Sequence, residues 1–353
     1  MTRPIMIMAG GTGGHVFPAL AVADYLKAKE IPVLWLGTEK GLEARVVPEA
    51  GYQLLTLSIA GIRGKSGITI LLAPFRILFA VIQALKVVVT HRPAAVLGMG
   101  GFASGPGGIA AWLMRTPVII HEQNAIAGMT NKWLSRIATR VFEAFPGAFP
   151  TNITAEHVGN PVRAAIENIQ KKNKENKTLR VLIVGGSLGA MTLNKVVPAS
   201  LAKVSGKIEI WHQTGQRDFE ATQEEYIALG IDAKVESFLN DMDQAYAWAD
   251  LVICRSGALT VSELAAAGLP AILVPYPYAV DDHQTANGEY LASADAAVII
   301  NDKDFSEEKL ITIINEWIAK PERLKEMSVK AKGKAIKGAT KNVANALMEV
   351  AYG

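Results

Sequence analysis

The chain has little cysteine and almost no net charge. Cys254 is the only cysteine among 353 residues, which excludes a disulfide framework and favours a reducing compartment such as the cytoplasm. The 36 Lys and Arg nearly balance the 33 Asp and Glu, so the charge does not indicate nucleic acid as the main partner. Hydrophobic residues make up 50% of the chain, and its length exceeds what one core usually serves. We therefore expect two domains, with any basic surface confined to a local patch.

The chain also lacks a good candidate for a membrane-spanning segment. Residues 68–85 are almost wholly apolar, but they include Arg76, which would cost roughly 2.5 to 3.5 kcal/mol at the centre of a bilayer. We reject a transmembrane helix and leave two alternatives open. The helix is either buried in its own domain, or its apolar face lies on a membrane surface next to the basic residues Arg63, Lys65, Arg76 and Lys86. Residues 1–4 precede a short apolar run without the pattern of a signal peptide, so we expect none.

Short apolar runs alternate with helical stretches, which is typical of the βαβ units of a doubly wound parallel sheet. The first half predicts strands at Ile5–Met8, Val33–Leu36, Leu54–Leu57, Ala95–Leu97, Val118–His121 and Arg140–Phe142. The second half predicts strands at Arg180–Val184, Ile208–His212, Ala233–Phe238, Leu251–Cys254, Ala271–Val274 and Ala297–Ile300. A polar stretch at 166–178 separates the halves, and we expect residues 307–351 to be helical. Pro18 is expected in the first turn of the first helix, where proline is tolerated.

Each half opens with a strand that runs into a glycine-rich turn. Gly10–His15 follows the first strand, and Gly185–Gly189 follows the first strand of the second half. Such turns expose N–H groups and the positive end of the next helix, which favours a phosphate or another oxygen-rich group. An imidazole such as that of His15 can take a proton from a hydroxyl, although His15 could also only cap or pack. Two such sheets facing one another would bring both turns to a shared cleft.

Three other patterns are weaker. Residues 98–103 match a dinucleotide fingerprint with Glu122 as the acid, but the glycines continue to Gly108, which favours a wide loop over a nicotinamide site. Residues 64–66 end like a P-loop but lack its leading glycine. Asp241–Asp243 and Asp302–Asp304 spell D-x-D, a pattern of metal-dependent sugar transferases, yet aspartate before a helix is usually a cap. We predict no cofactor and no obligatory metal.

The strongest pattern of the second half is Arg255–Glu263, which follows a predicted strand. Its turn supplies N–H groups, Ser256 and Thr260 supply hydroxyls, and Glu263 lies one turn inside the next helix. A carboxylate there can accept both hydroxyls of a ribose while the start of the helix faces a diphosphate. Thr260 and Glu263 could instead form a capping box, which needs no ligand.

The order of the motifs resembles a known family. GGTGGH, GMGGFASGPGG, HEQNAIAGMTNKWL, GNPVR, GGSLGA, CRSGALTVSELAAAGLPAILVPYP and DDHQTAN are similar, over nearly the whole chain, to the bacterial transferases that add N-acetylglucosamine to undecaprenyl-diphosphoryl-N-acetylmuramoyl-pentapeptide. The resemblance implies an α/β protein of GT-B architecture, with two Rossmann-like domains and an inverting transfer from UDP-N-acetylglucosamine. It implies an acceptor-binding, membrane-associating domain at 1–162, a UDP-sugar domain at 163–338 and a helix at 339–353 that packs back on the first domain.

The resemblance also implies site residues. Thr12, Gly13, Gly14 and Asn124 would meet the donor sugar and diphosphate, and Arg163 and Ser187 would lie along the diphosphate. Leu239 would offer backbone groups to the uracil. Diphosphate and ribose would be held by Ala258, Leu259, Thr260, Val261, Ser262 and Glu263, with Glu263 on the ribose hydroxyls. Gln284 would contact the sugar, and His283 competes for that place because the spacing of the family varies in this loop.

We hypothesise a single displacement in which the 4-hydroxyl of the acceptor attacks the anomeric carbon and UDP leaves. His15 is the first candidate base and Glu122 the second, while helix N-termini and Arg163 would stabilise the departing diphosphate. A lipid acceptor implies a peripheral protein at the inner face of the cell membrane, on an anionic surface and near other cell-wall synthesis proteins. Two alternatives stay open: a UDP-N-acetylglucosamine epimerase, which needs no acceptor, and a nucleotide-sugar sensor, which binds without turnover.

Overall fold

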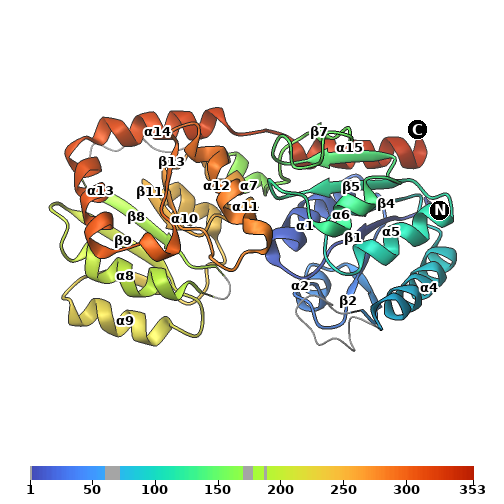
Figure 1. Ribbon diagram of the computed structural model, residues 1–353, viewed down its shortest axis with the longest axis horizontal. Coiled ribbons are helices and arrows are strands. Elements are labelled where there is room, and N and C mark those ends of the chain that lie inside the picture. The colour runs from blue at the N-terminus through green and yellow to red at the C-terminus, as the bar shows by residue number, and fades with distance from the viewer. Residues whose placement is uncertain (1, 60–71, 170–177, 187–188) are drawn as a thin grey trace. The chain divides into compact units, whose positions relative to one another are not determined.

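The computed structural model describes residues 2–59, 72–169, 178–186 and 189–353. The chain divides into two compact units (Figure 1). Unit 1 comprises residues 1–162 and 338–353, and unit 2 comprises residues 163–337. Gly338, which the sequence assigns to the second domain, therefore clusters with unit 1. Each unit contains its own parallel sheet with helices on both faces.

Among the described residues, unit 1 has a seven-stranded parallel sheet in the order β3-β2-β1-β4-β5-β6-β7. Its strands are β1 Ile5–Met8, β2 Val33–Thr38, β3 Gln53–Leu57, β4 Ala95–Gly98, β5 Val118–Glu122, β6 Arg140–Glu143 and β7 Glu156–His157. Its helices are α1 Gly13–Ala28, α2 Glu43–Glu49, α4 Ala73–His91, α5 Ser104–Leu113, α6 Met129–Leu134 and α15 Ala339–Tyr352. Of the strands in the described part of unit 1, only the exposed two-residue strand β7 carries no apolar signal in the sequence.

The two faces of this sheet are covered by different helices. Alternate residues of a strand point to opposite faces, so Ile5 and Ile7 of β1 join one core while Met6 and Met8 join the other. The first core contains α1 and α15, including Leu347, which is fully buried. The second core contains parts of α4, α5 and α6. The last helix is thus an integral part of unit 1, although 175 residues of unit 2 precede it in the chain.

Helix α1 begins earlier than the sequence analysis places it. Thr12 is the N-cap residue and Gly13 is the first helical residue, so Pro18 lies inside the helix rather than in its first turn. Proline lacks an N–H group, and the helix therefore loses the hydrogen bond to the carbonyl of Gly14. Gly14 belongs to the glycine-rich turn, so this exception falls beside the predicted site.

Helix α4 is exposed, which makes the buried-helix alternative wrong. It runs over Ala73–His91, later than the predicted 68–85, and residues 60–71, with Arg63 and Lys65, lie outside the described part. Only a narrow stripe is buried, formed by Ala80, Val81, Ala84 and Val88. Of its 18-residue apolar window only 22% is buried, and among the described residues it is the one helix long and apolar enough to cross a membrane.

Unit 2 has, in its described part, a six-stranded parallel sheet in the order β10-β9-β8-β11-β12-β13. Its strands are β8 Leu179–Val184, β9 Ile208–Gln213, β10 Ala233–Glu236, β11 Leu251–Cys254, β12 Ala271–Leu273 and β13 Ala297–Ile299. Its helices are α7 Ala164–Glu167, α8 Met191–Leu201, α9 Phe219–Ala228, α10 Met242–Trp248, α11 Ala258–Ala267, α12 His283–Ala292, α13 Glu307–Ala319 and α14 Pro321–Gly333. Two short 3-10 turns, η1 Val280–Asp282 and η2 Asp302–Asp304, precede α12 and α13.

Candidate active site

In each unit the glycine-rich turns lie at the carboxyl ends of the strands. The strand order reverses between β1 and β4 in unit 1, and between β8 and β11 in unit 2. Ligands of open parallel sheets bind in the crevice at such a switch point. The turn Gly10–Gly14 follows β1, and the segment Arg255–Gly257 follows β11. The topology therefore places a candidate site at this edge of each unit.

Both the backbone and the imidazole of His15 have fixed partners in unit 1. The backbone N–H of His15 donates to the carbonyl of Thr12 at 3.1 Å, in the first turn of α1, and the partners of the ring follow. Its Nδ1 lies 2.6 Å from Oε1 of Gln123, which follows β5. A Cβ atom at Gly100 would lie 2.9 Å from Cε1 of His15, so only glycine leaves room for the ring there. The ring is thus fixed beside the ends of β1, β4 and β5.

A buried carboxylate that the sequence analysis missed holds the glycine turn. Glu43 of α2 accepts hydrogen bonds from the N–H of Gly11 at 2.9 Å and from the N–H and hydroxyl of Thr38. Gly101 has a φ of +89°, and a Cβ atom there would lie 2.6 Å from the carbonyl oxygen of Gly10. The two glycine turns of unit 1 therefore pack backbone against backbone, and this contact leaves no room for a side chain at Gly101.

The predicted donor-binding residues of this turn are accessible. Thr12 is exposed, has extended backbone angles and makes no side-chain cap bond. Gly13 and Gly14 form the start of α1 and are partly exposed. The N-terminal end of α1 thus presents small residues and one hydroxyl to solvent.

Glu122 is buried and fully engaged with its own loop. Oε1 accepts from the backbone N–H and the side-chain amide of Asn124, at 2.9 and 3.1 Å. Oε2 accepts from the N–H of Gly128 at 3.0 Å and from the amide of Asn131 at 2.8 Å. A carboxylate that accepts from four donors is suited to fixing the loop after β5. Because these hydrogen bonds occupy both oxygens of Glu122, the geometry favours His15 over Glu122 as a base. Asn124, predicted at the donor sugar, is positioned by this carboxylate.

In unit 2 the structure brings Arg163 and Glu263 together. Glu263 of α11 is buried, and Nη2 of Arg163 lies 3.6 Å from its Oε1. The hydroxyl of Tyr246 donates to Oε2 at 3.1 Å. Burial raises the pKa of Glu263 from 4.5 to about 7, against the opposing influence of Arg163 and Tyr246. A carboxylate that is so poorly solvated gains from any further hydrogen-bond donor, such as a ribose hydroxyl.

The capping-box interpretation of Thr260 and Glu263 is wrong. Helix α11 begins at Ala258 with Gly257 as its N-cap residue, so Thr260 lies inside the first turn. The positive end of the dipole of α11 is therefore formed by Ala258, Leu259 and Thr260. Val261, which follows, is fully buried, and the hydroxyl of Ser262 donates to the carbonyl of Ala258. The hydroxyl oxygen of Ser256 is buried without a hydrogen-bond partner among the described residues.

The remaining predicted residues of unit 2 lie on neighbouring loops. Leu239 is buried in the loop between β10 and α10. Oε1 of Gln284 accepts from the backbone N–H of Tyr276 at 2.9 Å, which ties the start of α12 to the loop after β12. Ser187 lies outside the described residues. Gln284 and Leu239 thus border the same edge of the sheet as α11.

Neither D-x-D segment is an ordinary cap. Asp241 is the N-cap residue of α10 but makes no side-chain cap bond. Asp302 pairs with the guanidinium of Arg255 and accepts from the hydroxyl of Thr192 at 3.1 Å. Arg255 also donates to the carbonyls of Val274 and Pro275, so this pair joins the turns after β11, β12 and β13. Among the described residues no cluster of three His, Cys, Asp or Glu side chains could hold a metal ion.

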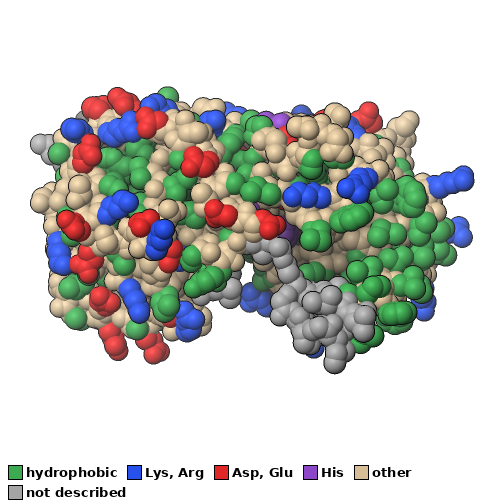
Figure 2. Space-filling model, in the orientation of Figure 1, with side chains coloured by type: hydrophobic (Ala, Val, Ile, Leu, Met, Phe, Trp, Pro, Cys, Tyr) green, Lys and Arg blue, Asp and Glu red, His purple; other side chains and the backbone are tan. Residues whose placement is uncertain are grey.

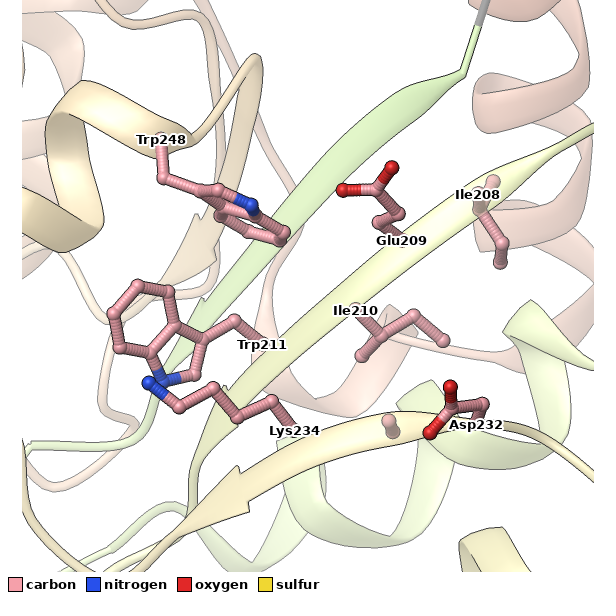
Figure 3. Close-up of a pocket in the computed structure, with 8 residues that line it drawn as sticks. Ile208, Glu209, Ile210, Trp211, Asp232, Lys234 and Trp248 are labelled. Carbon is pink, nitrogen blue, oxygen red and sulfur yellow. The ribbon is translucent and has the colours of Figure 1, made fainter.

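A hollow of about 510 Å³ in unit 2 is lined by other residues (Figure 3). It lies over β9 and β10 and is lined by Trp211, Trp248 and Lys234 among others. The ammonium group of Lys234 lies 3.5 Å from the centre of the Trp211 ring, and Arg180 lies over Trp248. The chain's own cations therefore cover the aromatic faces, and none of the predicted site residues lines this hollow.

Two Rossmann-like units with glycine turns and helix N-termini at their switch points define a GT-B glycosyltransferase. Residues 5–143 match the glycosyltransferase family 28 N-terminal domain, and residues 180–343 match the C-terminal domain of the same family. The crystal structure of Acinetobacter baumannii MurG superimposes with a TM-score of 0.86 at 41% identity, covering 98% of this chain and 99% of that one. A UDP-N-acetylglucosamine 2-epimerase has a TM-score of 0.67 at 13% identity, which reflects the fold alone.

Relatives in sequence define the family more narrowly. The UDP-N-acetylglucosamine–N-acetylmuramyl-(pentapeptide) pyrophosphoryl-undecaprenol N-acetylglucosamine transferase of Methylococcus capsulatus is 53% identical over 99% of both chains. The transferase of the same name from Alkalilimnicola ehrlichii is 50% identical over 99% of this chain and 100% of its own. The chain belongs to this family of transferases, as its motifs predict.

Proposed function

We propose that this protein transfers N-acetylglucosamine from UDP-N-acetylglucosamine to the lipid-linked N-acetylmuramoyl-pentapeptide, forming lipid II for peptidoglycan synthesis. The observation that carries the proposal is the identity of 53% over 99% of a transferase of this name. The geometry supports it further, because a fixed imidazole and two helix N-termini lie at the edges where a group transfer needs them.

The transfer is a single displacement with the roles divided between the units. The 4-hydroxyl of the acceptor gives its proton to Nε2 of His15, and its oxygen forms the new bond to the anomeric carbon. The bond between that carbon and the diphosphate oxygen breaks, and its electron pair leaves with UDP. Arg163 and the N-terminal end of α11 stabilise the charge that develops on the leaving diphosphate.

The donor is held by the residues that the family resemblance implies. Glu263 accepts the ribose hydroxyls, the first turn of α11 from Ala258 to Ser262 faces the diphosphate, and the loop at Leu239 contacts the uracil. Gln284 contacts the sugar from α12, and Thr12, Gly13, Gly14 and Asn124 contact the sugar from unit 1. Arg163 must partly release Glu263 when the donor binds, because both groups then have ligand oxygens as partners.

The decisive experiment follows UDP release by the purified protein. Release should depend on the lipid-linked acceptor. Sugar conversion without an acceptor would instead indicate an epimerase, and tight binding without turnover would indicate a sensor. His15→Ala should lower turnover by roughly a hundredfold or more. His157→Ala, an exposed histidine of the same unit, is the matched control and should retain it. Full activity of His15→Ala with an unchanged pH profile would contradict the role of this residue as the base.

The exposed apolar face of unit 1 supports peripheral membrane attachment. Large hydrophobic side chains gather over α4, the end of α5 and α6, and Figure 2 shows part of this face. The members that are at least half exposed are Phe75, Leu78, Phe79, Ile82, Trp112, Leu113, Met129 and Trp133. The basic residues Arg76, Lys86, Arg115 and Arg136 are exposed on the same three segments. This face is called the α4 patch below.

The energies suit reversible attachment to an anionic leaflet such as the inner face of the cell membrane. Each buried large side chain contributes roughly 1.5 to 3 kcal/mol, and each nearby basic residue roughly 1 kcal/mol. The protein should therefore co-sediment with vesicles that contain anionic lipid. Phe75→Glu with Phe79→Glu should abolish this binding, whereas Ile227→Glu with Val329→Glu, at equally exposed positions of unit 2, should not. If both double variants bound the anionic vesicles equally well, the α4 patch would not be the surface that attaches the protein to the membrane. Contacts with other cell-wall synthesis proteins would follow from this location.

A further inference from the structure

Beyond His15 itself, the structure contains a chain of hydrogen bonds that leads from this residue into the core. Nδ1 of His15 lies 2.6 Å from Oε1 of Gln123, and Nε2 of Gln123 lies 3.0 Å from Nδ1 of His121. The same Nε2 donates to the carbonyl of His121 at 2.8 Å. Nε2 of His121, at the end of β5, lies 2.8 Å from the carbonyl oxygen of Gly159. His121 and Gln123 are fully buried.

The buried end of this row of hydrogen bonds, at Gly159, determines which atom donates in each of them. The carbonyl of Gly159 can only accept, so Nε2 of His121 carries the hydrogen. Burial lowers the pKa of His121 to about 4, despite the opposing influence of Gly159 and Glu122, so the ring is neutral and its Nδ1 has a lone pair. That lone pair accepts from the amide of Gln123. A flipped amide would place its oxygen against two acceptors, the Nδ1 and the carbonyl of His121.

The amide oxygen of Gln123 therefore faces His15. We propose that Gln123 and His121 are positioning residues that hold neutral His15 as its Nδ1–H tautomer, with the lone pair on Nε2. Nε2 is then the atom that takes the acceptor proton, so the inference rests on the proposed function and specifies its base. An amide orients the ring as a carboxylate would, but without adding a negative charge.

The two carboxylates near this row of hydrogen bonds, those of Glu122 and Glu43, have other partners. Glu122 bonds to Asn124, Gly128 and Asn131, and Glu43 bonds to Gly11 and Thr38. The carboxylates of both residues thus hold backbone and amide groups of the loops beside His15. The tautomer of His15 is accordingly set by Gln123, whose oxygen lies closest to the ring in the described hydrogen bonds.

The test compares two variants of Gln123 in the full-length protein. Gln123→Leu removes the acceptor. Gln123→Glu keeps an acceptor for His15 but replaces the amide donor to His121 with a second oxygen, so the new carboxyl group or His121 must bind a proton for both contacts to persist. Long-range ¹H–¹⁵N spectra of the histidine rings at pH 8, assigned with His15→Ala, report the tautomer without need of substrate. Gln53→Leu, an exposed glutamine on β3, is the matched control. Thermal unfolding and near-ultraviolet circular dichroism establish that each variant is folded.

We expect wild type and Gln123→Glu to have the Nδ1–H pattern and Gln123→Leu to lose it. The kcat of Gln123→Leu should fall about 10- to 100-fold, which is less than the roughly 10²- to 10⁴-fold that a general base contributes, because the base itself remains. The KM for the donor should change little. Gln123→Glu should retain most of kcat, because the new carboxyl group still accepts from Nδ1 of His15. To the extent that this group is ionised, the acidic limb of the pH profile should move upward, because a carboxylate stabilises the protonated ring. If Gln123→Leu does not fold, the wild-type spectrum decides the question by itself, because it reports the tautomer of His15 without any substitution at Gln123.

An Nε2–H tautomer in wild type, or an unchanged tautomer and kcat in Gln123→Leu, would overturn the proposal. The spectra separate it from the proposed function. If His15→Ala retained full turnover, the base role of His15 would fall, whereas the tautomer of the wild-type ring would still test the positioning by Gln123 and His121.

Discussion

Replacing Glu263 with glutamine should stabilise the protein at neutral pH while weakening its binding of the donor. Burial raises the pKa of this carboxyl group from 4.5 to about 7. Between these two values the folded chain keeps a proton that the unfolded chain has released, so the folded state loses stability as the pH rises. Glutamine resembles the protonated form and does not titrate. The variant therefore avoids this loss.

The magnitude follows from the size of the shift. A rise in the pKa of Glu263 from 4.5 to about 7 corresponds to ~3 kcal/mol at pH 8 and to almost nothing at pH 4, which lies below both values. The free energy of unfolding of Glu263→Gln should thus exceed that of wild type by an amount that grows across this range. Urea titrations followed by tryptophan fluorescence at several pH values measure the difference directly.

Glu224→Gln is the matched control, because Glu224 is exposed on α9 of the same unit. Its difference from wild type should stay within about 0.5 kcal/mol at every pH. The reasoning would be refuted if Glu263→Gln had a difference that did not depend on pH, or one that remained below about 1 kcal/mol at pH 8. Either result would mean that the ionised carboxylate is well solvated or fully compensated by Arg163.

Three further predictions follow from the same structure. The affinity for UDP, measured by calorimetry, should fall about tenfold from pH 8 to pH 6, because a pKa of about 7 leaves few Glu263 side chains ionised at the lower pH. An affinity that does not change with pH would contradict the proposal that Glu263 binds the ribose hydroxyls. Leu347→Ala should destabilise unit 1 by about 2 to 5 kcal/mol in urea titrations, because this side chain is fully buried; an effect below about 1 kcal/mol would mean that α15 is dispensable. Gly101→Ala should lower the melting temperature more than Gly147→Ala. Both glycines have a positive φ, but only Gly101 lies against the carbonyl of Gly10. Equal decreases in melting temperature would refute the argument from this close contact.

The central strands of the sheets, such as β1, β4, β5 and β11, were predictable because they are buried on both faces. Such strands are continuous apolar runs, and Ile5–Met8 and Leu251–Cys254 have the predicted bounds. Strand β7 was not predictable, since Glu156 and His157 are polar and exposed. The position of Pro18 was wrong because the sequence does not show that the glycine turn is already helical at Gly13.

The site was predictable only where its residues are close in sequence. His15 and Glu263 stand inside compact motifs with recognisable chemistry. Gln123 is separated from His15 by 108 residues, and Glu43 is separated from Gly11 by 32, so no local pattern joins them. The capping box failed for the opposite reason, because the local pattern is valid but the helix begins before it. Gly257 is the N-cap residue of α11 and Ala258 its first residue, so Thr260 lies inside the helix and cannot cap it.

The two glycine turns are held by groups of different charge, and this difference bears on what each turn binds. In unit 1 the N–H of Gly11 donates to the carboxylate of Glu43 at 2.9 Å. In unit 2 the N–H of Gly186 donates to the neutral side-chain amide of Gln213, also at 2.9 Å, and the same amide donates back to the carbonyl of Gly186. A buried carboxylate beside the first turn repels a diphosphate, whereas an amide beside the second does not. The charges therefore favour the turn of unit 2 for the diphosphate, in agreement with the proposed function. They disfavour a diphosphate at the turn of unit 1, where the family resemblance also implies such a contact, and suit that turn to the neutral hydroxyl groups of the proposed substrates.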